Sequence, residues 1–549
     1  MRPIRVVAVR GLWQVDSSKS ETHPLQPTVN PPDDSTSYDE VPYPPYSFPA
    51  THIARLAAIG RMFSLPTADP GKARILELGC GSGVNLLAMA QLYPEAEFVG
   101  IDTSASHIEL AEEARSFTGL VNAHFIRGNV AHLEKDLGTF DYIIAHGLYS
   151  WVPAEVREAI LRLCREHLRV SGVAYISYNC LPGWRLRGAL RDMMSMHTRR
   201  TGNIRGKIDG SKALLKFLAA SCDEDTAYGR YLKQELDGLR GTDDAYLAHE
   251  FLETNNDAFY FSEFVQAAAA HHLAYLGEAD PSTMAVGDLP ERTAHALASL
   301  DLDFLGTEQY MDFARNRVFR STLLCHASAA LDRNIDRASL NGLEVMALVT
   351  LQKSFSDKEP AVFIGSNGKE IIVTDRNEAG ILERLAAAGR HSFPCDEVIE
   401  EAMRGRAMAP SESSAGRTQI ERFLRQSYFR GVIDLTVGPL GISAEGEKEK
   451  PCALPLARWQ ASKGYRVSSH RLDMLQPDTF VEKLIILCDG TRDREALIEA
   501  LAEAVDKGEL HLHEHGWPVH DQNRVRSLLE KIYDGSLEKL RRIGLLAGE

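Results

Sequence analysis

Apolar residues follow two periodicities between residues 71 and 185, and the two alternate along the chain. Short apolar runs predict strands, and runs with apolar residues every three or four positions predict helices. The predicted strands are 74–79, 97–102, 123–129, 140–147 and 172–179, and the predicted helices are 83–93, 106–117 and 155–168. This alternation is typical of an α/β fold with a Rossmann-like, doubly wound parallel sheet.

The segments before this region have a different composition. Residues 1–35 are polar and rich in Pro, Ser and Thr, which predicts a disordered N-terminal tail. Residues 36–70 contain Tyr43-Pro-Pro-Tyr46 and then an apolar, helix-like run that Thr51 can cap. We therefore expect an N-terminal lid and a helix ahead of the sheet.

The strand–helix alternation stops near residue 185. Residues 186–336 have an almost wholly helical pattern, which predicts a separate helical regulatory domain. Short strands and three helix-like runs indicate a winged-helix-like domain at 340–440, and residues 454–549 are predicted to form a C-terminal helical domain. The expected order is thus a nucleotide-type domain at 71–185 followed by helical and winged-helix-like modules.

A glycine-rich turn after the first predicted strand is the strongest chemical signal. Gly79, Gly81 and Gly83 follow the strand end at Leu78 and lead into a helix. Because glycine has no Cβ atom, such a turn lets a ligand approach the backbone closely. The spacing Gly-x-Gly-x-Gly differs from the Gly-x-Gly-x-x-Gly pattern of dinucleotide sites, whose pyrophosphate rests on the helix N-terminus.

Two acidic residues near the turn indicate which class of ligand it binds. Glu77 stands two residues before the first glycine, where a carboxylate would repel a pyrophosphate but suit the ammonium group of S-adenosylmethionine (SAM). Asp102 ends the second predicted strand, where it can accept from both ribose hydroxyls. This favours SAM over a nicotinamide or flavin, and over a site that has lost its ligand. Asn129, after the third strand, can accept from the adenine amino group or be an ordinary turn residue.

The Tyr43-Pro-Pro-Tyr46 segment is similar to the Asn/Asp-Pro-Pro-Tyr motif of enzymes that methylate amino groups on bases. In those enzymes the motif follows the fourth strand, where this chain has "HGLYSW" at 146–151. Permuted enzymes need several strands between motif and glycine turn, and too few residues lie between Tyr46 and Gly79. We interpret the segment as a lid in which Tyr38 and Tyr43 stack near the sulfonium or line the substrate channel. The alternative is a Tyr/Pro turn packed on the domain.

The composition of the chain indicates which class of partner it binds and in which cellular compartment it works. The net charge of −15 at pH 7 and the lack of a basic run argue against nucleic acid and fit a lysine-bearing protein partner. Apolar runs are too short to span a bilayer, so we expect no membrane insertion. The first apolar stretch contains arginines and lacks a signal-peptide core, which predicts a cytoplasmic protein. The eight cysteines have no zinc-ligand spacing, which predicts reduced thiols and no metal site.

Several longer stretches resemble one family of enzymes. They are "SYDEVPY" at 37–43, "ILELGCGSGVNLLAMAQLYPEAEFVGIDTS" at 75–104, "AHGLYSWVP" at 145–153, "ISYNCLPGW" at 176–184 and "YLAHEFLETNNDAFYFSEFVQAAAAHHLAYLGEA" at 246–279. These stretches are similar to bacterial protein-lysine methyltransferases with a methyltransferase regulatory domain, among them rickettsial enzymes that modify outer-membrane proteins. The resemblance implies a class I SAM-dependent fold, SAM as cofactor and protein lysines as acceptors.

The resemblance also implies the positions of site residues. On the cofactor side it places Glu77, Gly79, Gly81, Gly83, Asn85, Asp102, Asn129 and His146, and the lid adds Tyr38 and Tyr43. Tyr149 and Trp151 are expected to face the methyl donor and the acceptor, unless they are core residues that cover the strand ends. Tyr178, Asn179 and Trp184 are expected at the substrate-binding rim of the same cleft.

A lysine ammonium has no lone pair until it loses a proton, and its ordinary pKa is about 10.4. Burial beside a sulfonium lowers that pKa, so a dedicated strong base is not required. Aromatic faces can hold the amine while His146 or a water path takes the proton. The predicted catalytic residues are therefore His146 for the proton, and Tyr149 and Trp151 beside the methyl donor and the acceptor. Two other functions stay open: a SAM methyltransferase for small molecules, and a SAM-binding regulatory scaffold without turnover.

Overall fold

The computed structural model of the protein describes residues 40–133, 137–365, 368–404, 413–440 and 449–547. The predicted disordered tail at 1–35 and Tyr38 lie outside these residues. None of the described helices is both long and apolar enough to cross a membrane.

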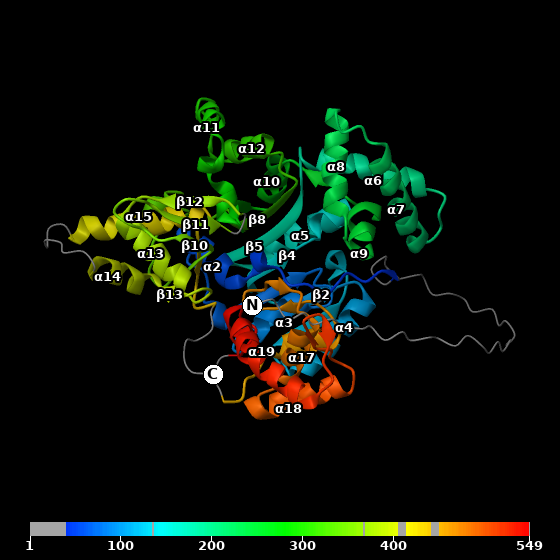
Figure 1. The fold of residues 1–549 in the computed structure, drawn as a ribbon. Helices are drawn as coiled ribbons and strands as arrows, with labels where there is room; N and C mark the ends of the chain where they lie inside the picture. The colour runs from blue at the N-terminus through cyan, green and yellow to red at the C-terminus, as the bar shows by residue number, and fades with distance from the viewer. Residues whose placement is uncertain (1–39, 134–136, 366–367, 405–412, 441–448, 548–549) are drawn as a thin grey trace.

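An eight-stranded sheet forms the centre of the molecule (Figure 1), and its main path runs in the order β3-β2-β1-β4-β5-β8-β7. The first five strands are parallel, as predicted, and their bounds are β1 (Arg74–Leu78), β2 (Glu97–Asp102), β3 (Ala123–Arg127), β4 (Phe140–Ala145) and β5 (Leu168–Cys180). The helices that follow β1, β2 and β4 are α3 (Val84–Ala90), α4 (Ala105–Thr118) and α5 (Ala154–His167). Side chains of α3 and α4 share one apolar core with the sheet, and those of α5 share a second. Both faces of the sheet are therefore covered.

The sheet continues well beyond residue 185. Short β6 (Ala258–Phe259) pairs with β5, β8 (Phe319–His326) runs antiparallel to β5, and β7 (Leu273–Glu278) runs antiparallel to β8. The prediction of a separate, almost wholly helical domain at 186–336 is therefore wrong for its second half. The apolar run around β7 has no clear period, and pairing with distant β8 makes it a strand.

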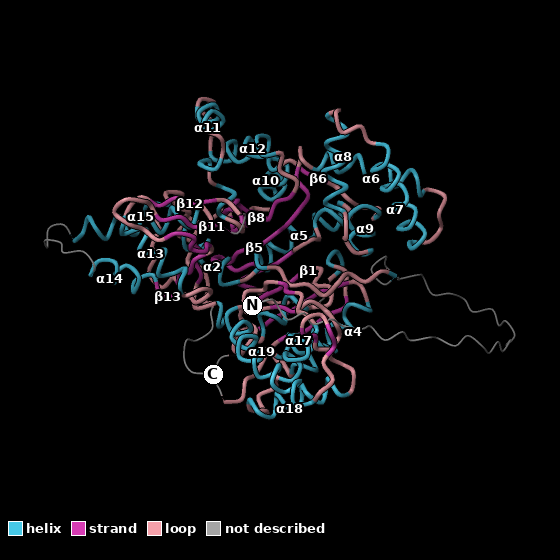
Figure 2. The backbone as a smooth tube through the Cα atoms, viewed as in Figure 1, coloured by secondary structure: helices cyan, strands magenta, loops and turns pink. Residues whose placement is uncertain are grey.

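A helical insertion separates β5 from β6 (Figure 2). Its side chains form an apolar core of their own. Its helices are α6 (Trp184–Thr198), α7 (Ile204–Ser221), α8 (Ala227–Leu239) and α9 (Asp244–Leu247), and α9 runs into a π-helical turn, η5 (Ala248–Leu252). Helices α10 (Phe261–Ala270), α11 (Glu291–Ala298) and α12 (Phe304–Arg315) accompany β7 and β8.

Two further modules follow the sheet. The first has α13 (Arg376–Ala387), α14 (Cys395–Arg404) and α15 (Ser413–Phe429), the sheet β13 (Phe393–Pro394)–β9 (Glu344–Ala347)–β14 (Ile433–Thr436), and the sheet β10 (Val349–Lys353)–β11 (Ala361–Gly365)–β12 (Glu370–Val373). The second has α16 (Pro455–Ser462), α17 (Thr479–Leu487), α18 (Arg494–Asp506), α19 (Gln522–Arg542) and the hairpins β15 (Val467–Ser468)–β16 (Met474–Leu475) and β17 (His513–Glu514)–β18 (Trp517–Pro518). The first shares the core of α3 and α4. The second has a core of its own, and its Leu456, Trp459 and Leu472 also join the core of α3 and α4.

The chain enters the sheet through a clamped N-terminal segment. Helix α2 (Ile53–Met62) is capped by His52, whose side chain accepts from Ala54 N, rather than by the predicted Thr51. Thr51 instead lies in the preceding turn, where its hydroxyl bonds Phe48 O at 2.8 Å and Asn85 Oδ1 at 3.1 Å. The N-terminal segment is thereby tied to α3 at the glycine turn.

A buried ion cluster fastens α12 to the added strands. The Arg320 side chain on β8 is fully buried and bonds Glu278 of β7 at 2.5 Å, Glu308 at 3.1 Å and Asp312 at 2.9 Å, both on α12. Its guanidinium also lies 4.1 Å from the centre of the Phe261 ring on α10. Arg320 is the cation that all three carboxylates share, and Asp312 also pairs with Arg317 at 3.1 Å.

We predict that Arg320→Met lowers the free energy of unfolding by about 3–5 kcal/mol, because it leaves the cluster's carboxylates buried without their main cation. Urea unfolding followed by circular dichroism measures the change. The exposed pair Arg494–Asp534 provides the control, and Arg494→Met should cost below about 1 kcal/mol. Equal costs for the two variants would show that the cluster does not fasten α12.

Candidate functional site

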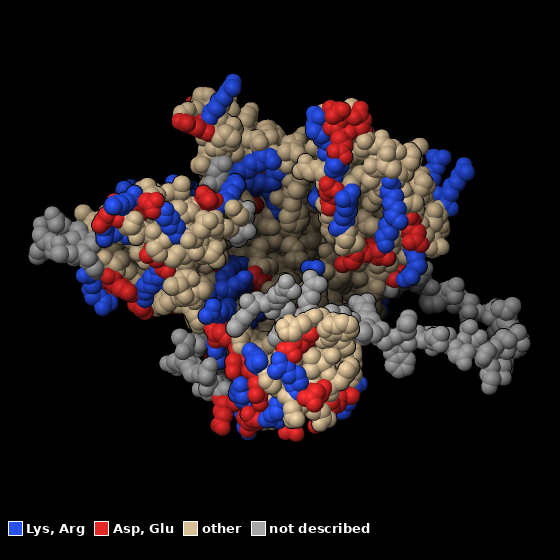
Figure 3. Space-filling view, in the orientation of Figure 1, with Lys and Arg blue, Asp and Glu red and all other residues tan. Residues whose placement is uncertain are grey.

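A cavity of ≈ 950 Å³ opens at the carboxyl ends of β1, β2 and β4. Its other walls come from the N-terminal segment around Tyr43 and Phe48 and from the π-helical turn η5. Figure 3 shows the molecule hollowed between the part that carries α6–α8 and the part that carries α10–α12. Open parallel sheets bind ligands at this edge, and the volume lies at the upper end of the roughly 300–1,000 Å³ typical of small-molecule sites.

The three predicted glycines all adopt left-handed backbone conformations, with φ of 69° at Gly79, 52° at Gly81 and 68° at Gly83. Gly79 and Gly81 line the cavity. Gly83 does not, since it caps α3 against β3, and a Cβ there would lie 2.4 Å from the Phe125 ring. The predicted contact of Gly83 with a cofactor is thus corrected to close packing of helix on strand.

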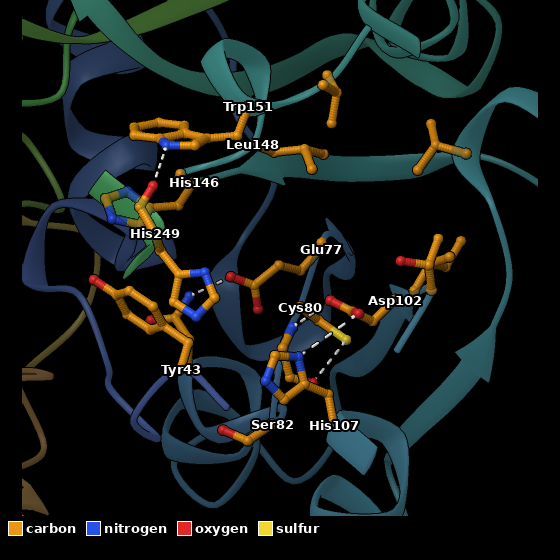
Figure 4. A pocket seen from close by; sticks show the side chains of 18 of the residues that line it. Tyr43, Glu77, Cys80, Ser82, Asp102, His107, His146, Leu148, Trp151 and His249 are labelled. Carbon is orange, nitrogen blue, oxygen red and sulfur yellow. Dashed lines mark hydrogen bonds and ion pairs between the residues drawn. The ribbon is translucent and has the colours of Figure 1, made fainter. Parts of the chain in front are cut away.

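Asp102 lies at the end of β2 and holds the turn from the opposite side (Figure 4). Its Oδ2 accepts from Gly81 N at 2.8 Å, and its Oδ1 accepts from Ser104 N at 2.9 Å. The carboxylate lines the cavity and is only partly buried, so its remaining lone pairs can accept from a ligand's hydroxyls.

Glu77 is buried at the end of β1 and lines the same cavity (Figure 4). Its Oε1 accepts from Asn85 Nδ2 at 2.8 Å, whereas its buried Oε2 has no hydrogen-bond partner among the described residues. Burial raises the pKa of this carboxyl group to about 8. An unpaired buried acceptor is costly, so the site fits a ligand that brings a cation or a donor to Oε2.

Asn85 joins Glu77 to the N-terminal segment. While its Nδ2 donates to Glu77, its Oδ1 accepts from Phe48 N at 3.0 Å and from the Thr51 hydroxyl. The hydrogen bonds of Asn85 thus hold the Glu77 carboxyl group and the N-terminal segment in fixed positions relative to each other. Asn85 lines the cavity, as predicted, and also positions the segment that covers it.

His146 follows β4 and contacts the same segment. The Tyr175 hydroxyl donates to Ser321 Oγ at 2.9 Å, so its oxygen accepts from His146 Nδ1 at 2.8 Å. This arrangement leaves Nε2 as the unprotonated nitrogen. The Phe48 ring lies 3.8 Å from the imidazole, and burial lowers the pKa of His146 to about 4. His146 is therefore neutral at physiological pH.

The cover of the cavity is built from three separate segments. His249 of η5 faces Val41 O through Nε2 at 2.6 Å, and the Tyr43 ring lies 5.7 Å from its imidazole. Trp151, in the loop after β4, donates from Nε1 to His249 O at 3.1 Å (Figure 4). Tyr43 and Trp151 both line the cavity, where the sequence places them.

Four other predicted residues do not line the cavity. Tyr149 and Tyr178 are buried in an aromatic cluster with Phe264, whose ring stacks on Tyr178 at 4.2 Å. Asn179 is buried and bonds Ser150 and Asn256, and buried Trp184 begins α6. For Tyr149 the structure agrees with the alternative expectation, a core residue that covers the strand ends, and not with the catalytic role. The predicted substrate contacts of Tyr178, Asn179 and Trp184 are corrected, because these side chains are buried and do not line the cavity.

The remaining predictions give a mixed picture. Asn129 lines the cavity and also accepts from Ala131 N at 2.9 Å as a turn residue. No cluster of three His, Cys, Asp or Glu side chains suited to a metal occurs in the described part of the chain.

Four residues that line the cavity are not among those predicted from the sequence: Phe48, His249, Glu250 and Phe319. The one available signal was the polar pair His249-Glu250 inside an apolar helical run.

Three family models match this chain. A methyltransferase domain matches residues 75–172, a predicted methyltransferase regulatory domain matches 243–326, and the C-terminal winged-helix domain of PKMT matches 449–545. The regulatory-domain match includes β7 and β8, and the winged-helix match falls on the segment predicted as a C-terminal helical domain.

Whole-chain similarities are also present. An uncharacterized protein of Rickettsia prowazekii, RP789, is 32% identical over 515 residues, which cover 92% of this chain and 93% of that protein. The structures of PKMT2 from Rickettsia typhi, one of them in complex with AdoHcy, superpose with a TM-score of 0.81 at 30% identity, covering 92% of this chain and 100% of theirs. A trans-aconitate 2-methyltransferase of Afipia carboxidovorans is 39% identical over 80 residues, 15% of this chain and 29% of that enzyme.

Similarity over nearly the full length, the three domain matches and a pocket suited to an ammonium and a ribose agree with one another. This chain therefore belongs to the family of bacterial SAM-dependent methyltransferases that combine a methyltransferase domain with a methyltransferase regulatory domain and a PKMT C-terminal winged-helix domain.

Proposed function

We propose that this methyltransferase transfers methyl groups from SAM to lysine side chains of a protein. The observation that carries the proposal is the buried, unpaired Glu77 Oε2 in a large cavity of a chain similar to PKMT2 over nearly its whole length. When bound, SAM supplies an electrophilic methyl group on a sulfonium. The cytoplasm is the proposed compartment, since all eight cysteines are free thiols.

Each wall of the cavity suits one part of the donor. Glu77 is placed to hold the ammonium group, and Asp102 the ribose hydroxyls. Gly79 and Gly81 let the backbone approach, and Asn129 can accept from the adenine amino group through its second lone pair. Asn85 keeps Glu77 in place, so that it acts as a positioning residue.

Aromatic side chains suit the acceptor side of the cavity. Tyr43, Phe48, Trp151 and Phe319 all line it. Their ring faces attract a methylated ammonium by about 0.5–2 kcal/mol each and exclude water from the reacting groups. The cavity is large enough for a donor together with an inserted lysine side chain. The net charge of −15 is consistent with a lysine-bearing acceptor and does not favour nucleic acid.

A small-molecule methyltransferase is the second candidate. The local similarity to trans-aconitate 2-methyltransferases covers only 15% of the chain, and the modules beyond the sheet are much larger than a pocket lid requires. A regulatory scaffold without turnover is a third candidate, and the complete set of acid, glycines and second acid argues against it.

We predict that incubation of the protein with methyl-tritiated SAM and cell lysate places label in acid-precipitated protein. Amino-acid analysis should recover the label as methylated lysine. Label confined to small molecules would favour the second candidate. Tight SAM binding without any labelling would favour the scaffold.

We predict that Asp102→Ala weakens SAM binding about 100-fold or more, because two charge-assisted hydrogen bonds of roughly 1.5–3 kcal/mol each are lost. Isothermal calorimetry measures the change. Glu109→Ala removes an exposed carboxylate from the adjacent helix α4 and should leave the affinity unaltered. Unchanged affinity in Asp102→Ala would exclude the proposed ribose site.

We predict that SAM affinity rises about tenfold per pH unit between pH 6 and 7.5. Glu77 must lose its proton to bind an ammonium, its pKa in the free protein is about 8, and SAM's amino group stays charged in this range. Glu77→Gln should bind SAM weakly at every pH, and its affinity should not increase with pH. The folded protein holds the proton of Glu77 more tightly than the unfolded chain, so the wild type loses free energy of unfolding as the pH rises above 4.5. Glu77→Gln avoids this loss and should be at least as stable as the wild type at pH 8. A rise that persists in Glu77→Gln would assign it to another group.

A further inference from the structure

The π-helical turn η5 brings two consecutive polar residues to the cavity. Helix α9 passes into η5 at Ala248, and both His249 and Glu250 line the cavity. Turns of this kind are rare and occur frequently at functional sites. Glu250 has no role in the proposed SAM site, and it belongs to the helical insertion rather than to the nucleotide-type half of the sheet.

The backbone on either side of Glu250 is rigidly held. His249 O accepts from the Trp151 indole, and His249 Nε2 donates to Val41 O. The carbonyl of Glu250 itself accepts from Asn256 Nδ2 at 2.7 Å. These bonds connect η5 to the loop after β4 and to the N-terminal segment, so the position of Glu250 relative to the reaction site is fixed.

Glu250 is also the carboxyl group on the acceptor side. Among the described residues that line the cavity, the acids are Glu77, Asp102 and Glu250. The first two surround the glycine turn, whereas Glu250 stands next to His249, which packs against Tyr43 and bonds Trp151. The side chain of Glu250 is 19% exposed, so a cationic side chain that enters the cavity can reach it.

The charges around Glu250 keep it available as a base. Arg187 on α6 lies 3.8 Å from its Oε1, but Arg187 is shared with Glu235 on α8 at 3.3 Å. The phenols of Tyr43 and Tyr246 also lie near Glu250, whose charge helps to raise the pKa of both. Burial raises the pKa of Glu250 to about 7, although Arg187 opposes the shift.

We propose, on the basis of the lysine methylation proposed above, that Glu250 binds the acceptor lysine and takes its proton. The Glu250 carboxylate accepts one proton from the ammonium and becomes a neutral acid, which leaves a neutral amine with a lone pair. The amine nitrogen then forms a bond to the methyl carbon as the carbon–sulfur bond breaks, and that electron pair stays on sulfur. The product is a methylated ammonium, and Glu250 returns its proton to water.

Glu250 suits this role better than His146. Burial lowers the pKa of His146 to about 4, so its Nε2 is a weak base. Raising a carboxyl pKa from 4.5 to about 7 favours proton transfer from lysine by roughly a few hundred-fold. A base with a pKa near the working pH is also the most effective in general catalysis.

The test is the pH profile of methylation in Glu250→Gln. The rate is measured at a SAM concentration that saturates the enzyme at every pH, so that protonation of Glu77 does not limit it. Wild-type incorporation of tritium from SAM into lysate protein should then fall as the pH drops below about 7, because Glu250 gains a proton there. The variant should lose about 100-fold or more of the rate at pH 8 and lack this acid limb, with an unchanged calorimetric affinity for SAM. Glu250→Asp should keep the limb. A Glu250→Gln variant within about threefold of the wild-type rate, with the same limb, would overturn the inference.

Arg187→Gln provides a matched variant. Because the Arg187 charge holds the pKa of Glu250 down, its loss should shift the acid limb to higher pH and leave the rate at pH 9 largely intact. If the acid limb of the pH profile does not move in Arg187→Gln, it belongs to a group other than Glu250, and the proposal is overturned. Unfolding midpoints at pH 8 check that each variant folds. A wild type that labels no protein would refute the proposed function itself, whereas labelling that ignores Glu250 would refute this inference alone.

Discussion

The Glu77 carboxyl group is held away from water at the end of β1, with one oxygen bonded to Asn85 and the other unpaired. A pKa raised from 4.5 to about 8 means that burial disfavours the charged carboxylate by roughly 5 kcal/mol relative to its state in water. A cation at Oε2 offsets this cost. The left-handed glycines bring the backbone close to the same space, and Asp102 holds their turn in shape. The site is therefore organised for a ligand that carries an ammonium and a ribose.

The same carboxyl group is connected to the cover of the cavity. Asn85 links Glu77 to Phe48 and Thr51, and the hydroxyl of Ser47 bonds Ser468 and Leu472 of the C-terminal module. The helical insertion joins through the bond of His249 to Val41. Three parts of the chain that are distant in sequence thus meet on one short segment. Substitutions in the C-terminal module can alter the pocket through Ser47 without any direct contact with a ligand.

Local patterns predict the nucleotide-binding half of the site well. The turn, its two acids and the parallel strands are encoded by neighbouring residues, so their spacing is sufficient to place them. Local sequence could not place Tyr149 and Tyr178, because the direction of a side chain after a strand depends on what packs there, here Phe264 of a distant helix. Asn179 was misplaced for the same kind of reason, since it is buried against Ser150 and Asn256. Strands β7 and β8 were missed for a similar reason, since β8 pairs with distant β5 and β7 pairs with β8. The position of Glu250 in the cavity could not be predicted from the polar pair His249-Glu250, because a π-helical turn does not follow the regular helical period.

A crystal structure of the chain with AdoHcy is the most direct measurement of the central claim. The amino group of the ligand should lie within hydrogen-bond distance of Glu77 Oε2, and its ribose hydroxyls should reach the Asp102 carboxylate. Its sulfur should face the part of the cavity lined by His146, Trp151 and Glu250. AdoHcy bound elsewhere, or bound here with Glu77 Oε2 still unpaired, would contradict the account.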